Sequence, residues 1–254
     1  MKELHVILDM QFGSCGKGLF AGYLARRIKA DTIITAWAPN SGHTYIDEHG
    51  NKFVNIAIPN GIVSPHLRQI LIGPGSVINP KQMIAELEEY ARFIGNAKIV
   101  IHEHAAVVDD SHRSEEAAYA HKIGSTMKGV GAAVIQKIKR DPDNMNIAKT
   151  ALMGTPLEGY VATVGEYNDA IDSSCVTIIE GAQGFSLSMN QGFYPYTTSR
   201  DCTLHQLLSD CAIPACLTTS PLFQMQIHGV CRTYPIRVAN RFDKDGIQIG
   251  RAHV

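Results

Sequence analysis

A glycine-rich loop near the N-terminus has the residues needed to hold the phosphates of a nucleotide. The run Gly13-Ser14-Cys15-Gly16-Lys17-Gly18 follows an apolar segment, Leu4 to Leu8, and precedes apolar residues at helical spacing. Closely spaced glycines let backbone amides converge on an anion at a helix N-terminus, and a lysine adds positive charge. The run is not a Walker A sequence, which has a longer gap and a hydroxyl residue after the lysine. By itself the loop is equally typical of a plain turn, and its place after the first strand favours a phosphate site.

A histidine among small polar residues forms the second candidate group, Asn40-Ser41-Gly42-His43-Thr44. A histidine can donate to the charge that develops on a phosphoryl group, as electrophile or general acid near neutral pH. A lone loop histidine is more often structural or solvated. We interpret the other ten histidines in that way, with His102, His104 and His112 as a surface cluster.

Two hydroxyl residues, Ser125 and Thr126, precede the glycine-bearing start of a predicted helix. This helix is expected to end near Arg140. This geometry suits a monophosphate. It equally suits a simple N-cap, in which serine or threonine accepts from the first free amides of the helix. Arg140 alone reads as an exposed charge.

The segment Glu180-Gly181-Ala182-Gln183-Gly184 lies where a strand ends, which is where α/β sheets bind ligands. A buried glutamine amide presents a donor and an acceptor together, so Gln183 can read the six-position carbonyl of a purine and the neighbouring ring nitrogen. Tyr194 to Ser199 then supply a rigid turn and further hydroxyls, among them Thr198.

Apolar β-branched runs alternate with helical patterns, which predicts an α/β fold with a mainly parallel central sheet and flanking helices. The predicted strands are Leu4–Leu8, Thr32–Trp37, Phe53–Ile58, Gln69–Ile72, Ala97–His102 and Val176–Glu180, and the predicted helices include Gly16–Ile28 and Pro80–Phe93.

Composition limits the function classes. The chain has 254 residues, 45% of them hydrophobic, and a net charge of -1 with no basic stripe, so we expect no nucleic-acid partner. We find no apolar run of roughly 18 to 20 residues and no signal peptide, so we expect no membrane association and a cytoplasmic location, in the host cell if the chain is phage-encoded. The six cysteines are expected to be reduced and mostly buried, although Lys17 could lower the pKa of Cys15.

These motifs occur in the order and at about the separations found in adenylosuccinate synthetases, which residues 1 to 238 resemble. The resemblance implies a P-loop-related fold and a homodimeric ligase that uses Mg²⁺ and a nucleoside triphosphate to join L-aspartate to a purine monophosphate. It implies that Ser14, His43 and Gln183 are catalytic, and that Ser14 and Gly42 contact the metal. The implied triphosphate site is Gly13, Ser14, Gly16, Lys17, Gly18, Gly42, His43 and Thr44. The implied monophosphate site is Ser14, Asn40, Ser125, Thr126, Gln183 and Thr198, with Arg140 reaching the neighbouring subunit's site.

One departure bears on the substrate. Ser14 stands where family members carry the catalytic aspartate, and together with the segments Thr198–Thr203 and Arg232–Val238 it resembles the phage branch of the family. Enzymes of that branch join aspartate to dGMP on the way to 2-aminoadenine DNA. A carboxylate and its metal would crowd the two-amino group of guanine, whereas a serine can accept a hydrogen bond from it. The resemblance therefore implies dGMP, L-aspartate and ATP or dATP as substrates, and leaves open which group removes the N1 proton.

Two alternatives stay open, a standard synthetase that uses inosinate and GTP, and a nucleotide-binding module without catalysis. The family's aspartate-gripping segment, Thr-Thr-x-x-x-Arg-x-Arg-Arg, is not found. We expect a nucleotide-binding synthetase domain at residues 1–238 with its C-terminal part missing, and an irregular tail at 239–254. Our hypothesis for the last six residues, 249–254, is that they are a translated sequencing adapter.

Overall fold

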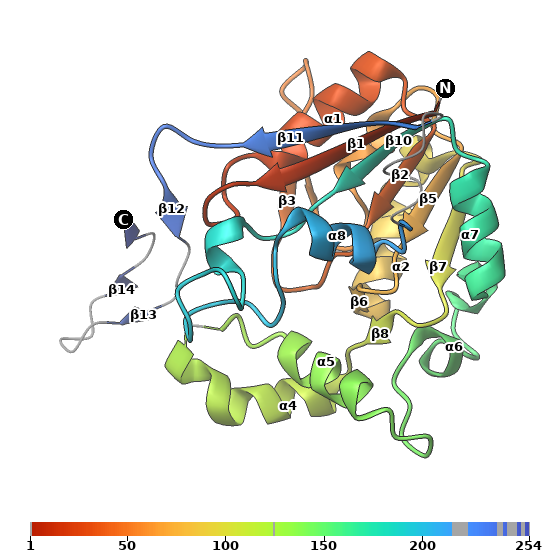
Figure 1. The fold of residues 1–254 in the computed structure, drawn as a ribbon. Helices are drawn as coiled ribbons and strands as arrows, with labels where there is room; N and C mark the ends of the chain where they lie inside the picture. The colour runs from red at the N-terminus through yellow and green to blue at the C-terminus, as the bar shows by residue number, and fades with distance from the viewer. Residues whose placement is uncertain are drawn as a thin grey trace.

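Seven parallel strands form the centre of the computed structural model, which describes residues 2–123, 125–214, 223–237, 241–242, 248–249 and 252–253 (Figure 1). The strand order is β11-β1-β10-β2-β5-β7-β9, and every neighbouring pair is parallel. The strands are β1 (Lys2–Asp9), β2 (Thr32–Thr35), β5 (Gln69–Ile72), β7 (Lys98–His102), β9 (Val161–Ala162), β10 (Val176–Glu180) and β11 (Phe223–Val230). The mainly parallel sheet is thus confirmed.

Helices flank this sheet, and four separate two-stranded ladders accompany it in the described part of the chain. The helices are α1 (Lys17–Ile28), α2 (Pro80–Glu89), α3 (Ala91–Ile94), α4 (Asp110–Tyr119), α5 (Val130–Lys139), α6 (Ala148–Ala151), α7 (Val164–Asp172) and α8 (Leu204–Asp210). The ladders pair β3 (His43–Ile46) with β4 (Lys52–Asn55), β6 (Val77–Ile78) with β8 (Ala106–Val107), β12 (Ile236–Arg237) with β15 (Ala252–His253), and β13 (Arg241–Phe242) with β14 (Gln248–Ile249). No helix in the described part of the chain is long and apolar enough to cross a membrane.

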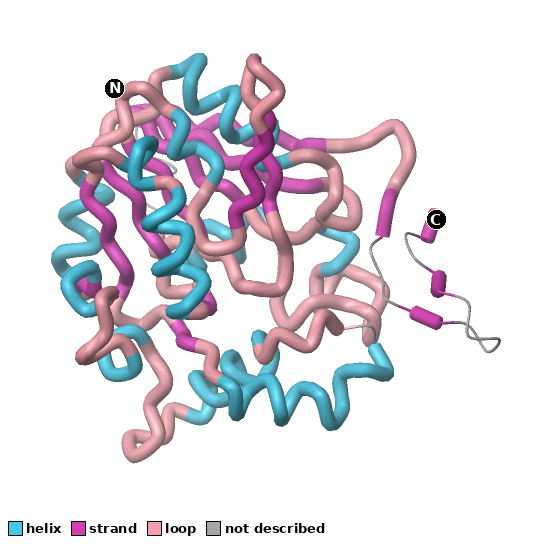
Figure 2. The backbone as a smooth tube through the Cα atoms, turned by 180° about the vertical axis from the view of Figure 1, so that it is seen from behind, coloured by secondary structure: helices cyan, strands magenta, loops and turns pink. Residues whose placement is uncertain are grey.

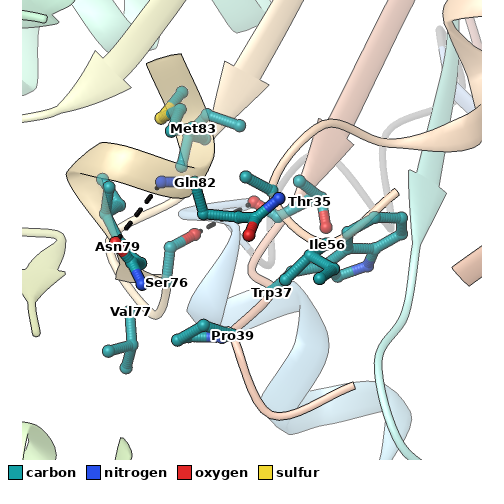
Figure 3. A pocket seen from close by; sticks show the side chains of 12 residues that line it. Thr35, Trp37, Pro39, Ile56, Ser76, Val77, Asn79, Gln82 and Met83 are labelled. Atoms are coloured by element: carbon teal, nitrogen blue, oxygen red, sulfur yellow. Dashed lines mark hydrogen bonds between the residues drawn. The ribbon is translucent and has the colours of Figure 1, made fainter. Parts of the chain in front are cut away.

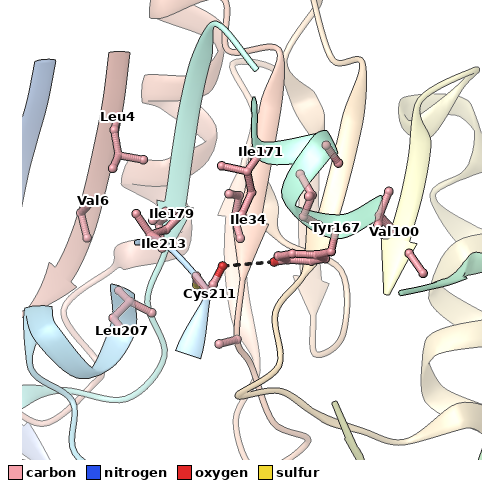
Figure 4. Close-up of a cluster of buried hydrophobic side chains, with 14 of the residues drawn as sticks. Leu4, Val6, Ile34, Val100, Tyr167, Ile171, Ile179, Leu207, Cys211 and Ile213 are labelled. Carbon is pink, nitrogen blue, oxygen red and sulfur yellow. Dashed lines mark hydrogen bonds between the residues drawn. The ribbon is translucent and has the colours of Figure 1, made fainter. Parts of the chain in front are cut away.

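Alternate residues of each central strand pack on opposite faces of the sheet. In β1, Leu4 and Val6 lie in one core with Tyr167 of α7 and Leu207 of α8 (Figure 4), whereas Ile7 faces α1 on the other side. Each fully buried side chain of this size stabilises the fold by about 1.5–3 kcal/mol. Helices on both faces are what make the strands apolar along their length.

Three predicted elements end earlier than the sequence indicates, and the first is the strand predicted at Thr32–Trp37, which ends at Thr35. The strand predicted at Phe53–Ile58 ends at Asn55, because the next three amides donate to the buried carboxylate of Glu86 instead of to a neighbouring strand. The helix predicted at Pro80–Phe93 breaks at Tyr90, whose backbone is non-helical and whose ring is buried in the core, so that α3 begins afresh.

The strand order places three loops at one end of the sheet. β10 lies between β1 and β2, so the loops that follow Asp9, Thr35 and Glu180 leave adjacent strand ends. The α4–α5 pair lies beyond one end of the sheet when it is seen from the front and from behind (Figures 1 and 2), and α5 contacts β6 and β8. Of the predicted tail at 239–254, the structure describes only the three residue pairs given above.

Candidate active site

The glycine-rich loop folds around a carboxylate that the sequence reading did not single out. Asp9 ends β1, and its oxygens accept hydrogen bonds from the amides of Gln11, Gly13 and Cys15 at 2.9–3.0 Å. Although burial disfavours the charged form, Lys17 and these amides outweigh it and hold the pKa of Asp9 below its usual range. Asp9 is therefore a fixed anion inside the loop. Its position at the carboxyl end of a parallel strand was the signal that could have identified it.

Lys17 is buried at the start of α1 with 2% of its surface exposed. Its Nζ donates to the carbonyl oxygens of Gly13 (3.0 Å) and Gln183 (2.6 Å) and lies 3.4 Å from Asp9 Oδ2. In this conformation the ammonium group joins the phosphate loop to the β10 loop. Contact with a triphosphate would require it to exchange at least one of these partners.

The start of α1 is open to a ligand. Gly16 is the N-cap with a left-handed backbone (φ 97°), and no side chain caps the helix. A Cβ on Gly18 would lie 2.9 Å from Thr44 O and 2.5 Å from Asn60 Nδ2, so only glycine permits α1 to pack this closely against β3. This packing brings the glycine-rich loop and the His43–Thr44 segment together, as the resemblance implies.

His43 is enclosed between an indole ring and a carboxyl group. The rings of Trp37 and His43 are parallel within 8°, with centroids 3.6 Å apart. Its Nε2 lies 3.4 Å from Ser41 Oγ, and its Nδ1 lies 4.0 Å from Glu180 Oε1. Burial, with repulsion from Lys17, lowers the pKa of His43 well below its usual value. His43 is thus a neutral imidazole, which suits a hydrogen-bond donor more than a permanent charge.

Glu180 is fully buried beneath this histidine. It accepts hydrogen bonds from the backbone amide and the side chain of Asn60, and burial raises its pKa to about 8. The Glu180 carboxyl is therefore mostly protonated at neutral pH. Because His43 is neutral too, their 4.0 Å contact is not an ion pair.

In the side-chain amide of Gln183, the nitrogen has a hydrogen-bond partner and the oxygen has none among the described residues. Its Nε2 donates to Asn40 Oδ1 at 2.8 Å, whereas its buried Oε1 has no hydrogen-bond partner among the described residues. The backbone of Gln183 is left-handed (φ 50°), and it packs against Gly13 closely enough that a Cβ there would lie 3.1 Å from its Cα. The Gln183 Oε1 atom is thus an acceptor that no described residue occupies.

Ser14 is half-buried, and it takes no part in the hydrogen bonds that Asp9 and Lys17 make within the loop. Its hydroxyl is thus left for other partners. The neighbouring Cys15 corrects one expectation, because burial first and then Asp9 raise the pKa of its thiol to about 11. The negative charge of Asp9 outweighs the effect of Lys17, so Cys15 is a neutral thiol.

The hydroxyls of Ser125 and Thr126, which we expect at the monophosphate, make no hydrogen bond to this cluster in the described part of the chain. Ser125 Oγ donates to Glu116 at 2.8 Å and accepts from the amide of Met127, and Thr126 is exposed. Arg140 is exposed at the C-cap of α5, whose ten residues span about 15 Å. Among the described residues, no hydrogen bond or ion pair joins Ser125, Thr126 or Arg140 to Gln183.

Thr198 belongs to a loop that docks on the phosphate loop. Its amide donates to Leu187 O, and the amide of Ser186 donates to Gln11 O at 2.9 Å. The rings of Phe12 and Phe193 stack with centroids 6.0 Å apart. These contacts place the Thr198 loop beside the glycine-rich loop.

Two further expectations are wrong. His102 and His112 are buried, not on the surface. Burial, helped by His104 and Lys137, lowers the pKa of His102 to about 4, and His112 completes the capping box of α4. Of the described cysteines, only Cys211 is buried. The sequence did not reveal this because helix caps and core contacts depend on residues brought together by folding.

The chain belongs to the adenylosuccinate synthetase family, a family of carbon–nitrogen ligases. The adenylosuccinate synthetase family model matches residues 6–150 and 143–241. This finding confirms both the resemblance and the fold class.

Phage enzymes are among its relatives. It is 42% identical to the N6-succino-2-amino-2'-deoxyadenylate synthase of Acinetobacter phage SH-Ab 15497, with 98% of this chain and 69% of the relative covered. It is 31% identical to the adenylosuccinate synthetase of Thermococcus onnurineus, with 92% and 66% covered. The solved structure of the Cyanophage S-2L succinoaminodeoxyadenylate synthetase, bound to dGMP and to dATP as an energy donor, superposes with a TM-score of 0.87 at 39% identity, covering 100% of this chain and 70% of that one.

Proposed function

We propose that this chain joins L-aspartate to the six-position of dGMP and hydrolyses ATP or dATP, yielding 2-amino-2'-deoxyadenylosuccinate, the nucleoside diphosphate and phosphate. The observation that carries the proposal is Ser14, a small half-buried residue in the phosphate loop. The chain that carries it is similar to phage N6-succino-2-amino-2'-deoxyadenylate synthases. The relative from Cyanophage S-2L binds dGMP and dATP, which supports the same pair of nucleotides here.

The nucleotide triphosphate would bind at the open start of α1. Gly16, Lys17 and Gly18 would hold its phosphates through amides and the ammonium group, with Gly13 and Thr44 at the border of the site. His43 would donate a hydrogen bond to the phosphoryl group during its transfer to the purine oxygen, for which a neutral imidazole is suited.

The oxygens of Ser14 and Gly42 are those proposed to hold Mg²⁺. Both are oxygen donors, the type that Mg²⁺ prefers, and Gly42 is exposed beside Val54. Among the described residues no group of three or more His, Cys, Asp or Glu side chains is placed to hold a metal. Phosphate oxygens of the nucleotide would therefore supply the negatively charged ligands. When bound, Mg²⁺ neutralises negative charge on the phosphates.

The purine would lie against Gln183 and Asn40, with the two-amino group near Ser14. The unpartnered Oε1 of Gln183 can accept a hydrogen bond from the base. Ser125, Thr126 and Thr198 would bind the 5'-phosphate, and Arg140 of a second copy would complete the site in a homodimer. We assign all of these residues to one nucleotide-binding domain at 1–238.

The test compares kcat/KM for dGMP and inosinate, with aspartate and ATP present, in the wild type and in the variants Ser14→Asp and Ser14→Ala. We expect the wild type to prefer dGMP. Ser14→Asp should reverse the preference by about 10- to 200-fold, because the carboxylate crowds the two-amino group. Ser14→Ala removes the hydroxyl without adding bulk, so it separates the hydrogen bond from the steric effect. Faster turnover of inosinate by the wild type would contradict the proposal and favour a standard synthetase.

A further inference from the structure

Trp37 is the only tryptophan in the sequence, and it lies directly against the histidine of the candidate site. Trp37 is 3% exposed and His43 6% exposed, and the centroid distance of 3.6 Å leaves no room for another group between the rings. Rotation of the imidazole out of its plane would bring it into the indole. The stack therefore fixes the plane of the His43 ring, and in the structure Nε2 is on the side of Ser41.

The indole is itself fixed by hydrogen bonds. The indole Nε1 donates to the carbonyl oxygen of Glu180 at 2.9 Å, and the backbone carbonyl of Trp37 accepts from the amide of Val77 at 2.9 Å. Trp37 also lines a pocket with Pro39, Asn79 and Met83 (Figure 3). His43 does not line this pocket. The loop after β2 is thus anchored to β10 and β6 through this one residue.

The other neighbours of His43 do not fix its ring. Glu180 Oε1 is 4.0 Å from Nδ1, beyond hydrogen-bond distance, and the carboxyl group is already bonded to Asn60. Ser41 Oγ is 3.4 Å from Nε2, at the outer limit of a hydrogen bond. The parallel stack on Trp37 is therefore the contact that fixes the plane of the imidazole.

We propose that Trp37 is a positioning residue for His43, holding the plane of the imidazole so that Nε2 meets the phosphoryl oxygen. The inference rests on the proposed function, because it assumes that His43 takes part in phosphoryl transfer.

The experiment compares Trp37→Leu with Trp37→Phe on whichever monophosphate the wild type turns over. Misplacement of a catalytic group by about 1 Å can cost 100-fold in rate, so Trp37→Leu should lower kcat by about that factor. The KM for the monophosphate should change by less than about threefold, because Trp37 contacts neither Gln183 nor the phosphate loop in the structure. Trp37→Phe keeps an aromatic face and should recover most of kcat.

A matched control separates positioning from loss of packing. Tyr167→Leu removes a fully buried aromatic ring that contacts a different histidine, His102, at 5.0 Å between centroids. This variant should lose stability but keep kcat. Equal losses of kcat in Tyr167→Leu and Trp37→Leu, or full kcat in Trp37→Leu, would overturn the inference.

Fluorescence provides a readout that does not depend on turnover. Emission of the single tryptophan should change when a non-hydrolysable ATP analogue binds, and the change should disappear in His43→Ala, because the ring that transmits it is gone. An unchanged response in His43→Ala would overturn the inference even if Trp37→Leu does not fold. If the wild type turns over inosinate but not dGMP, the proposed substrate fails, while the Trp37 series still reports on His43.

Discussion

Two parts of the proposed site differ in how complete they are within one chain. Around β1, β2 and β10, the groups are buried and bonded to one another, with Lys17 contacting Asp9 and the Gln183 carbonyl oxygen at 2.6–3.4 Å. Around α4 and α5, the hydroxyl of Ser125 is already bonded to Glu116, and Arg140 points from an exposed helix end. The first part is assembled by the fold itself, whereas the second has its polar groups turned to other partners or to solvent.

This difference indicates that the fold itself holds the proposed triphosphate side, apart from the Lys17 ammonium group, and the Gln183 amide in place. The proposed 5'-phosphate side would depend on ligand or on a second copy. Preorganised donors raise the rate because no reorganisation is needed during the reaction. Sites that close on binding use part of the ligand's binding energy for that closure. The three predictions below test the two halves separately.

The largest effect is expected from Lys17→Met. Removing one partner of a buried ion pair leaves the Asp9 carboxylate without its cation, which typically costs about 3–5 kcal/mol. The free energy of unfolding, measured with urea, should fall by that amount. In Lys81→Met, where the lysine is exposed on α2, it should not change.

The double variant Asp9→Asn, Lys17→Met sharpens this result. With the carboxylate also removed, it should be more stable than Lys17→Met alone, although less stable than the wild type because an amide fits three N–H donors poorly. A loss below about 1 kcal/mol in Lys17→Met would show that the three amides alone satisfy Asp9.

A smaller, pH-dependent effect is expected from Glu180. Burial raises its pKa from 4.5 to about 8, so between these values the folded state binds more protons than the unfolded state. Stability should therefore fall as pH rises through this window and become level above about pH 8. Between pH 7 and 8 the loss should be about 1 kcal/mol.

The measurement is the free energy of unfolding at pH 7 and 8, a range above the ordinary pKa of histidine. Glu180→Gln has no carboxyl to titrate, so its stability should not change across this range, although its added N–H donors face the amides of Asn60 and should lower stability throughout. Equal slopes in the variant and the wild type would mean that Glu180 is not the titrating group.

The smallest effect on stability is expected from Arg140→Ala. The side chain is exposed, so the free energy of unfolding should change by less than about 0.5 kcal/mol. Activity should nevertheless be lost, because we expect Arg140 to act in the site of a second copy. Lys139→Ala, at the neighbouring exposed position, serves as the control and should keep activity.

Mixing two inactive variants tests the shared site directly. Arg140→Ala combined with His43→Asn should regain activity, since a hybrid dimer contains one site with both residues intact. If the mixture stays inactive while each protein is folded and dimeric, Arg140 acts within its own chain or not at all.

Much of the fold could be predicted from the sequence because buried parallel strands are continuous apolar runs. β5 and β10 were predicted with the bounds that the structure shows, and α1 within a residue. β11 was not predicted, because it lies at the sheet edge and alternates Gln224, Gln226 and His228 with apolar residues. The pattern there is that of a strand covered on one face.

The candidate site was predicted where a motif lies within one loop and was missed where distant residues meet. Gln183 and His43 stood out because of their neighbours in the sequence. Trp37 did not, since its contact with His43 depends on the turn of the chain between them. The hydrogen bond of Ser125 to Glu116 and the buried position of His102 against Tyr167 depended likewise on residues that folding brings close.

The carboxylate of Asp9 inside the glycine-rich loop has a practical consequence for the protein without nucleotide. A loop of converging amides ordinarily needs a bound anion to hold its shape, but this one supplies its own. Sulfate or phosphate in the buffer should therefore do little to stiffen residues 11–15. An oxyanion seen in a crystal would instead occupy the uncapped first turn of α1.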